Sequence, residues 1–264
     1  MDGILERLVR GERLPERVVL VVAHPDDETL ALASRMNRMD DLCIVHLTDG
    51  SPRDMQDARR VGAETVEEYA ELRRQELRAA MAVLDATPEL RCCWHPDKEA
   101  ILHGAAIVEQ LVRYLWDAEV VVTHSYEHGH PDHDTAALCV ALACRHLEAQ
   151  GRPAPRHLEF PSYHLRDGRT VFGSFWTDPN APEVKIPLSP EDQDRRRRSL
   201  ACFESQMGFL NQVPHWEEWL RPAPAYDFRA PAPPGSALYD GWGWNMTLTE
   251  WRRHADTLLD QASP

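Results

Sequence analysis

Four short apolar runs, each followed by a stretch of helical pattern, limit the fold of this 264-residue chain more than any other feature. The first run, RVVLVVA at residues 17–23, is rich in β-branched side chains, as expected of a strand buried on both faces. Strands that alternate with helices indicate a doubly wound, mainly parallel sheet. The expected strands are residues 17–23, 42–47, 91–94 and 119–123, and the expected helices are residues 28–39, 64–84, 105–116 and 136–147.

The composition of the chain changes after residue 150. Most of the 20 prolines and six of the eight tryptophans lie beyond this point, and residues 221–237 are especially rich in proline. We expect an irregular C-terminal arm whose tryptophans mostly pack in the core or at a subunit interface, although a stacking platform over a ligand is the alternative. The basic run at residues 195–198 lies beside acidic residues and is typical of a solvated helix face.

Charge and cysteine content exclude several classes of protein. The net charge of -14 argues against a nucleic-acid partner, because lysine and arginine drive phosphate binding. The six cysteines form no CxxC pair, which favours reduced thiols. We expect no signal peptide and no membrane span, and therefore a cytoplasmic protein.

The first polar cluster, HPDDE at residues 24–28, follows the first expected strand directly. Three carboxylates beside one imidazole repel one another unless a positive charge lies among them. That charge could come from a metal ion or from arginine and lysine, or the cluster could be solvated by bulk water. The structural alternative is a helix N-cap, in which Asp26 or Asp27 accepts backbone N–H groups.

A second polar cluster, THSYEHGHPDHD at residues 123–134, follows the fourth expected strand. Parallel strands bring their carboxyl ends to one edge of the sheet, where ligands bind. Zinc takes imidazole nitrogen and carboxylate oxygen as ligands, and a catalytic zinc usually keeps three protein ligands. The two clusters together could supply such a set. In the second polar cluster, His124 could hydrogen-bond a metal ligand without touching the metal, or it could be a buried histidine bonded to backbone.

The pair HPDDE at 24–28 and HPDH at 130–133 resembles the LmbE-like, or PIG-L, family of zinc-dependent N-deacetylases. The resemblance covers residues 17–147 well and thins to FPSYH at residues 160–164. It implies a single Rossmann-like, three-layer α/β domain over residues 1–264, with a core at 1–150 and a variable part at 151–264 that completes the fold and the substrate pocket.

The resemblance also implies roles for individual residues. Asp26 would be the general base that activates a metal-bound water, His130 would stabilise the tetrahedral intermediate, and Asp132 would orient His130. The implied metal ligands are His24, Asp27 and His133. The expected metal is Zn²⁺, with Fe²⁺ possible in the cell.

The residues expected to contact the substrate match the family less closely than the metal ligands do. Arg73 and Asp97 match positions that contact the substrate sugar in relatives, although surface salt bridges would explain both residues. His128 stands where many relatives carry Tyr or Gly, so it is expected at the mouth of the site. His164 is a weaker candidate for the site.

The activity implied by the resemblance is removal of an acetyl or larger acyl group from the nitrogen of an amino sugar or its conjugate. One alternative is an amidase that acts on a sugar–thiol conjugate or another small amide. A second alternative is a non-catalytic module that binds a metal or a sugar. The expected partner is a small-molecule substrate, and a homo-oligomer is possible.

Overall fold

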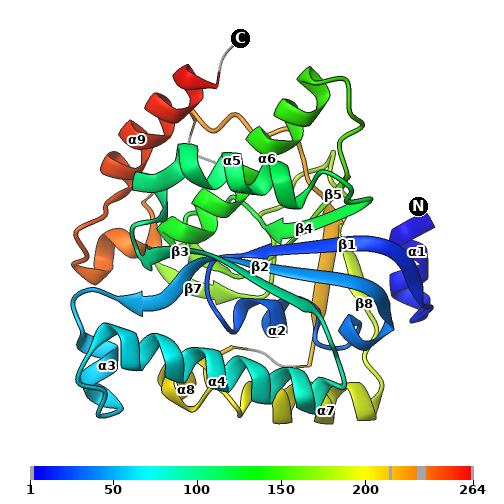
Figure 1. Ribbon diagram of the computed structural model, residues 1–264, viewed down its shortest axis with the longest axis horizontal. Coiled ribbons are helices and arrows are strands. Elements are labelled where there is room, and N and C mark those ends of the chain that lie inside the picture. The colour runs from blue at the N-terminus through cyan, green and yellow to red at the C-terminus, as the bar shows by residue number, and fades with distance from the viewer. Residues whose placement is uncertain (1–2, 214–215, 231–235, 263–264) are drawn as a thin grey trace.

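The computed structural model describes residues 3–213, 216–230 and 236–262, and its centre is a seven-stranded sheet in the order β3-β2-β1-β4-β5-β9-β8 (Figure 1). The first five of these strands pair in parallel, and β9 pairs antiparallel with both of its neighbours. The expected mainly parallel α/β fold is therefore confirmed. The strands of this sheet are β1 (Leu14–Val22), β2 (Met39–Pro52), β3 (Glu89–Asp97), β4 (Val120–His124), β5 (Arg156–Phe160), β8 (Val184–Ile186) and β9 (Glu218–Pro222).

Helices cover both faces of the sheet, which gives three layers (Figure 1). One face carries α2 (Asp27–Leu32), α4 (Val66–Leu84), α7 (Pro190–Leu200) and α8 (Met207–Leu210), and the other carries α5 (Gly104–Tyr114), α6 (Pro131–Ala149) and α9 (Leu248–Gln261). The remaining elements are α1 (Gly3–Arg10), α3 (Gln56–Arg60), the hairpin β6 (Tyr163–Arg166) and β7 (Arg169–Phe172), and the 3-10 turns η1 (Met36–Arg38), η2 (Ala100–His103), η3 (Glu204–Gln206) and η4 (Leu238–Trp242).

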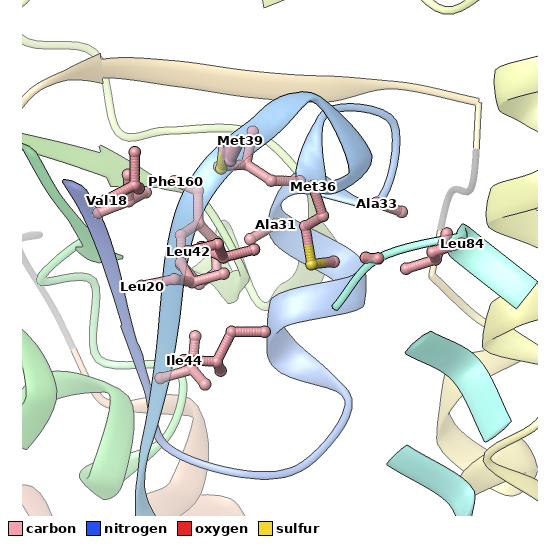
Figure 2. Packing of buried hydrophobic residues seen from close by; sticks show 14 of the residues in the cluster. Val18, Leu20, Ala31, Ala33, Met36, Met39, Leu42, Ile44, Leu84 and Phe160 are labelled. Atoms are coloured by element: carbon pink, nitrogen blue, oxygen red, sulfur yellow. The ribbon is translucent and has the colours of Figure 1, made fainter. Parts of the chain in front are cut away.

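The alternation of side chains along β1 explains why the sheet is buried on both sides. Val18 and Leu20 belong to one apolar cluster, together with side chains of α2 and α4 (Figure 2). Val19 and Val21 point the other way, into a cluster with α5, α6 and α9. Successive strand residues face opposite sides, so a run without polar residues must be covered twice.

The expected helix at residues 28–39 is wrong in length. Helix α2 ends at Leu32, and Met39 already begins β2. The backbone N–H of Ser34 donates to Glu218 of β9 at 3.0 Å, and the Ser34 hydroxyl donates to the same carboxylate. A side chain 184 positions later therefore takes the hydrogen bonds that a longer helix would have used within itself.

The region after residue 150 is more regular than expected, because β8 and β9 extend the central sheet and α9 packs against α5, α6 and η2. Trp251 of α9 is fully buried in the core, but Trp216 and Trp242 are exposed and Trp176, Trp219 and Trp244 are half-buried, so the expected core packing holds for Trp251 and not for most tryptophans of this region. The Pro-rich stretch at residues 221–237 lies partly in β9 and partly outside the described residues. Among the described helices, none is long and apolar enough to cross a membrane.

The basic run at residues 195–198 is not entirely a solvated face. Arg196 is only 2% exposed, and its guanidinium donates to Glu218 Oε1 at 2.9 Å. The side chains of Arg197 and Arg198 remain more than half exposed and pair with Asp194. The expectation holds for these two arginines and is wrong for Arg196, because α7 turns that side chain toward α2 and β9.

The order of the strands determines where a site can form. From β1 the chain moves outward through β2 to β3, whereas β4 returns to the other side of β1 and leads to β5. The boundary between β1 and β4 is thus the point where the direction of winding reverses, and ligands bind beyond the strand ends at such points. Both polar clusters follow these two strands.

Candidate metal centre

A cavity of about 240 Å³ opens beyond the ends of β1 and β4. Seven of the nine site residues expected from the sequence line it, and Asp132 and His128 do not. The seven lining residues are His24, Asp26, Asp27, Arg73, Asp97, His130 and His133.

The three carboxylates of HPDDE have three different partners. Glu28 is fully buried and binds His46 at 3.1 Å, so it points away from the cavity. Asp26 accepts a hydrogen bond from Arg73 at 3.1 Å. Asp27, the first residue of α2, faces the histidines. The repulsion expected from the sequence is therefore relieved by a histidine, an arginine and a potential metal position.

Asp27 joins two of the expected metal ligands. Its Oδ2 lies 3.3 Å from His24 Nδ1, and its Oδ1 lies 3.4 Å from His133 Nε2. His133 is 1% exposed, yet neither ring nitrogen has a hydrogen-bond partner among the described residues. A buried polar group without a partner is costly, and coordination of a cation would satisfy it. Among the described residues, Asp27 and His133 belong with His124 to one group whose donor atoms could share a metal ion, and His24 and His133 belong with His130 to another. Imidazole nitrogen and carboxylate oxygen are donors that suit zinc.

His24 is held by carboxylates on its other side. His24 Nε2 lies 3.2 Å from Asp132 Oδ2 and 3.1 Å from Asp97 Oδ1. Burial opposes a charge on the His24 ring, but Asp97, Asp132 and Asp27 outweigh burial and raise its pKa well above the usual value. In the neutral ring, a proton on Nε2 facing these carboxylates would leave the lone pair of Nδ1 for a metal, which is how outer carboxylates orient metal-binding histidines.

Asp132 acts on a different histidine from the one that the resemblance implied. Its carboxylate contacts His24 and also accepts the backbone N–H groups of Lys98 and Ala100, at 2.6 and 3.0 Å. His130 is instead bonded by the backbone N–H of Asp132, which donates to His130 Nδ1 at 3.1 Å. The side chain of Asp132 therefore orients His24, and its backbone orients His130.

His130 is the N-cap of α6, and this position determines its tautomer. Because Nδ1 accepts a backbone N–H, the proton of the neutral ring lies on Nε2. Burial lowers the pKa of His130 well below the usual value, and the neighbouring His24 and His133 lower it further. His130 thus presents a neutral N–H donor at the cavity.

His124 is a residue whose place the sequence left open. Its Nε2 lies 3.4 Å from Asp27 Oδ2, and its ring stacks on His133 with centroids 3.9 Å apart. Its Nε2 also accepts the N–H of Ala23 at 3.1 Å, and its Nδ1 lies 2.9 Å from Ser162 Oγ. Burial lowers the pKa of His124 to about 3, and His133 adds to this. Because Nε2 accepts the Ala23 N–H, it has no proton to donate to Asp27, so His124 is a buried histidine bonded to backbone whose ring packs on His133. Asp27, His124 and His133 also form one of the groups whose donor atoms could share a metal ion.

The adjacent Asp26 and Asp27 differ in their electrostatics. Burial raises the pKa of Asp26 well above the usual value, and Arg73 only partly counters this. Burial acts on Asp27 too, but His133 and His124 outweigh it and hold the pKa of Asp27 well below the usual value. Two neighbouring groups whose pKa values are driven apart are a common arrangement in acid–base sites. Asp26 also has a φ of 142°, a strained conformation of the kind that clusters at functional sites.

The structure places His128 away from the expected position. It is 1% exposed, and its Nδ1 lies 3.0 Å from Asp134 Oδ2. It is absent from the described residues that line the cavity, because this pairing directs its ring toward Asp134. His164 is likewise buried, and its Nδ1 lies 3.2 Å from Glu127.

Several aromatic residues line the cavity although the sequence did not single them out as site residues. Tyr163 lies in the FPSYH segment, and its ring meets that of His133 at a centroid distance of 5.2 Å. Phe209, Trp242 and Trp244 also line the cavity. None of these three residues belongs to a motif, and only the enrichment of tryptophan after residue 150 hinted at the two tryptophans.

We expect Gly129→Ala to destabilise the loop that carries His130. A Cβ at this position would lie 1.8 Å from the backbone oxygen of Tyr163, so the loop or β6 must move. The expected cost is about 1–3 kcal/mol of unfolding free energy in a denaturant titration. Gly208→Ala is the control, because its Cβ would meet no atom within 4 Å. Equal stability of both variants would contradict the close approach.

We expect His133→Ala to abolish tight zinc binding. The substitution removes the ring that faces Asp27 Oδ1 and leaves one imidazole and one carboxylate of the set. Calorimetric titration of the metal-free protein with zinc would show about one site in the wild type, as three protein ligands require, and none of comparable affinity in the variant. His254→Ala, at a half-buried position of α9 outside the His/Asp cluster, should bind zinc as the wild type does. Unchanged zinc binding in His133→Ala would show that the zinc site does not include His133.

Fold and site together define a doubly wound α/β protein with a buried His/Asp cluster that could hold a metal ion, at the point where the winding reverses. Residues 19–144 match the family model described as "PIG-L: GlcNAc-PI de-N-acetylase". This segment, which contains both polar clusters, is therefore similar to the PIG-L family.

A curated relative from Geodermatophilus obscurus, 1D-myo-inositol 2-acetamido-2-deoxy-alpha-D-glucopyranoside deacetylase, is 29% identical over 171 residues. That match covers 53% of this chain and 55% of the relative, so it spans about half the length of each. A triple mutant of a deacetylase of the teicoplanin biosynthetic pathway superposes with a TM-score of 0.61 at 16% identity, over 80% of this chain and 99% of that one. A conserved protein from Thermus thermophilus gives a TM-score of 0.54 at 19% identity, over 83% of this chain and 100% of that one. These superpositions show a shared fold.

Proposed function

We propose that this protein is a metal-dependent N-deacetylase that removes an acetyl group from the nitrogen of an amino sugar or its conjugate. The observation that carries the proposal is Asp27 set between His24 and His133, with Asp26 beside them in the same cavity. The match of residues 19–144 to the PIG-L family model and the name of the curated relative support the substrate class.

The reaction adds water across an amide: the carbonyl carbon gains an oxygen, the C–N bond breaks, and acetate and a free amine leave. A divalent cation held by His24, Asp27 and His133 would supply Lewis-acid polarisation and a lowered pKa of water. Asp26 takes a proton from the attacking water on a carboxylate oxygen and returns it to the amine nitrogen as the C–N bond breaks. Arg73 holds Asp26 in place for both transfers.

His130 stabilises the charge that develops on the carbonyl oxygen. Its Nε2–H is available because Nδ1 is occupied by the backbone of Asp132. A donor of this kind contributes about 3 kcal/mol to transition-state stabilisation. Arg73 and Asp97 also line the cavity, so they remain the proposed substrate contacts beside their contacts to Asp26 and His24.

Zinc is the proposed metal, with ferrous iron as the alternative in the cell. The nitrogen and oxygen donors suit both ions. Teicoplanin deacetylase, which shares the fold, has been solved in a zinc inhibited form, so the metal-refilling experiment must compare both ions. We further propose a cytoplasmic location, in keeping with the six free cysteines.

The experiment is an acetate-release assay on protein stripped of metal and refilled with zinc or ferrous iron. We expect acetate from N-acetylglucosamine with the refilled protein and none with the stripped protein. Equal turnover of simple N-acetyl amines would favour the small-amide alternative. Zinc binding without hydrolysis of any N-acyl compound would favour the non-catalytic binding module.

A further inference from the structure

A second cavity, of about 340 Å³, lies between β3, at the edge of the central sheet, and α4. Its volume falls within the range of about 300–1,000 Å³ that is usual for ligand pockets. Alternate residues of β3 form one wall, and residues about one turn apart on α4 form the other. These wall residues are Leu90, Cys92 and Trp94 of β3 and Arg74, Leu77 and Arg78 of α4. None of these six lines the cavity of the candidate metal centre.

The α4 wall has an excess of positive charge, although the chain as a whole has a net charge of -14. Arg74 and Arg78 share the carboxylate of Glu71, at 2.6 and 3.4 Å. Arg91, which also lines the second cavity, pairs with Glu89, and an arginine of β1 contacts the same carboxylate. Each carboxylate thus serves two guanidinium groups. An anion in the cavity would accept further N–H groups from these arginines in charge-assisted hydrogen bonds.

The negative charge within the lining is already neutralised. Asp49 is the one carboxylate among the described residues that line the second cavity. Arg53 engages both of its oxygens, at 2.8 and 3.4 Å, and the N–H of Ser51 donates to it at 2.9 Å. Asp49 is therefore held by its own partners and opposes an anion only weakly.

Trp94 gives the second cavity an exposed aromatic wall. It is 58% exposed, more than any other large hydrophobic side chain in the described part of the chain, and its φ is 62°. A bulky residue at a positive φ is strained, and such strain clusters at functional sites. The Trp94 N–H donates to Cys92 Sγ at 3.2 Å, and the Cys92 thiol donates to the Thr48 carbonyl at 3.3 Å. Arg74 lies over the indole at 5.1 Å from its centroid, so aromatic surface and positive charge lie side by side.

The second cavity lies behind the loop that carries Asp26. Pro25 lines it, whereas the neighbours His24 and Asp26 line the cavity of the metal centre. His46 also lines it, and its Nε2 lies 3.1 Å from Glu28 Oε2, the oxygen that accepts the N–H of Asp26. An occupant would therefore contact Pro25 and His46 without entering the cavity of the metal centre.

We propose that the second cavity binds a small planar aromatic anion, and that the bound anion stabilises the loop of residues 24–28 from behind. The aromatic ring packs on Trp94 and Leu90, and the guanidinium groups of Arg74 and Arg78 bind the negative group. The occupant is an effector of the loop rather than a substrate. The inference does not depend on the proposed reaction, and its test measures no turnover.

The first test is calorimetric titration of the full chain with 2-naphthalenesulfonate, for which we expect one saturable site. Methyl 2-naphthyl sulfone has the ring without the charge, and methanesulfonate has the charge without the ring. Both should bind at least about tenfold more weakly, because charge-assisted hydrogen bonds are about twice as strong as neutral ones and the indole needs a ring to stack on. Equal affinity for either of these two compounds would overturn the inference.

Arg74→Gln combined with Arg78→Gln should raise the Kd of 2-naphthalenesulfonate at least about tenfold, because it removes both charges of the α4 wall. The matched control is Arg197→Gln combined with Arg198→Gln. These two arginines likewise share one carboxylate, that of Asp194, but they line neither cavity. The control should bind as the wild type does, and equal affinities of the two double variants would contradict the assigned site.

Trp94→Gly removes the indole and tolerates the positive φ, since glycine adopts this conformation without strain. It should weaken binding of 2-naphthalenesulfonate at least about tenfold. The control is Trp116→Gly, because Trp116 is 43% exposed and also has an arginine, Arg152, at 4.6 Å from its ring centroid, but it lies outside the second cavity. Equal losses in both variants would show that the compound binds exposed indoles in general, and would refute the site.

Hydrogen exchange followed by mass spectrometry tests the effect on the loop. Saturating 2-naphthalenesulfonate should slow exchange in peptides that contain residues 24–28, because a ligand of the folded form suppresses local opening. Peptides of α9, on the other face of the sheet, should change less. In Trp94→Gly the same concentration should not alter exchange of the loop. Saturated binding that leaves exchange of residues 24–28 unchanged in the wild type would overturn the proposed stabilisation.

Discussion

Asp26→Asn is expected to lower the rate of N-deacetylation by about 10²–10⁴-fold while zinc remains bound. The amide has nearly the shape of the carboxylate and can still accept the hydrogen bond from Arg73, but it cannot take a proton from water. Asp26 is 7% exposed, so bulk solvent does not readily replace it as a base. The measurement is kcat for acetate release, with zinc content determined on the same sample.

The control for this prediction is Asp117→Asn, which removes one carboxylate from a side chain that is 75% exposed. Its turnover should equal that of the wild type. Wild-type turnover in Asp26→Asn would remove Asp26 from the mechanism and leave the proposed metal site intact. Loss of zinc from the variant would instead assign Asp26 to the metal site.

The sequence predicted strands β1 to β4 of the central sheet because their signal is local, whereas β5, β8 and β9 were not expected. β-branched runs such as residues 17–23 are buried on both faces, and their composition alone indicates this. The end of α2 could not be predicted in the same way. It depends on the contact of Ser34 with Glu218, and no local pattern in residues 28–39 reports a partner so distant in the chain.

In the candidate site, too, the features set by local sequence were predicted and those set by distant contacts were not. His24 to Glu28 and His130 to His133 are compact motifs at strand ends, so their convergence follows from strand order. The partner of each polar side chain was harder to predict, and Asp132 illustrates this. Its carboxylate reaches His24 rather than His130, because residues 130 and 132 both lie in the first turn of α6 while His24 approaches from β1. Trp242 and Trp244 reach the cavity from a turn without any periodic pattern.

The buried contacts of Glu218 that coincide with the end of α2 also make Glu218 important for stability. Its carboxylate binds Arg196 of α7 and Ser34 after α2, and all three residues are buried. It therefore joins β9 to two helices on one face of the sheet. Helix α2 begins with Asp27, so this contact also supports the segment that carries a proposed metal ligand.

Glu218→Ala is accordingly expected to lower the free energy of unfolding by about 3–5 kcal/mol, because it leaves the Arg196 charge buried without its carboxylate. Asp194→Ala removes a carboxylate that pairs with Arg197 and Arg198 on the exposed side of the same helix, and it should leave the free energy of unfolding nearly unchanged because exposed ion pairs contribute little. Denaturant titration of both variants measures the difference. Replacing Arg196 by Met in the Glu218→Ala background should recover part of the loss, since no buried charge remains. Equal costs for the two single variants would show that the pair of Arg196 and Glu218 is no more important than a surface ion pair.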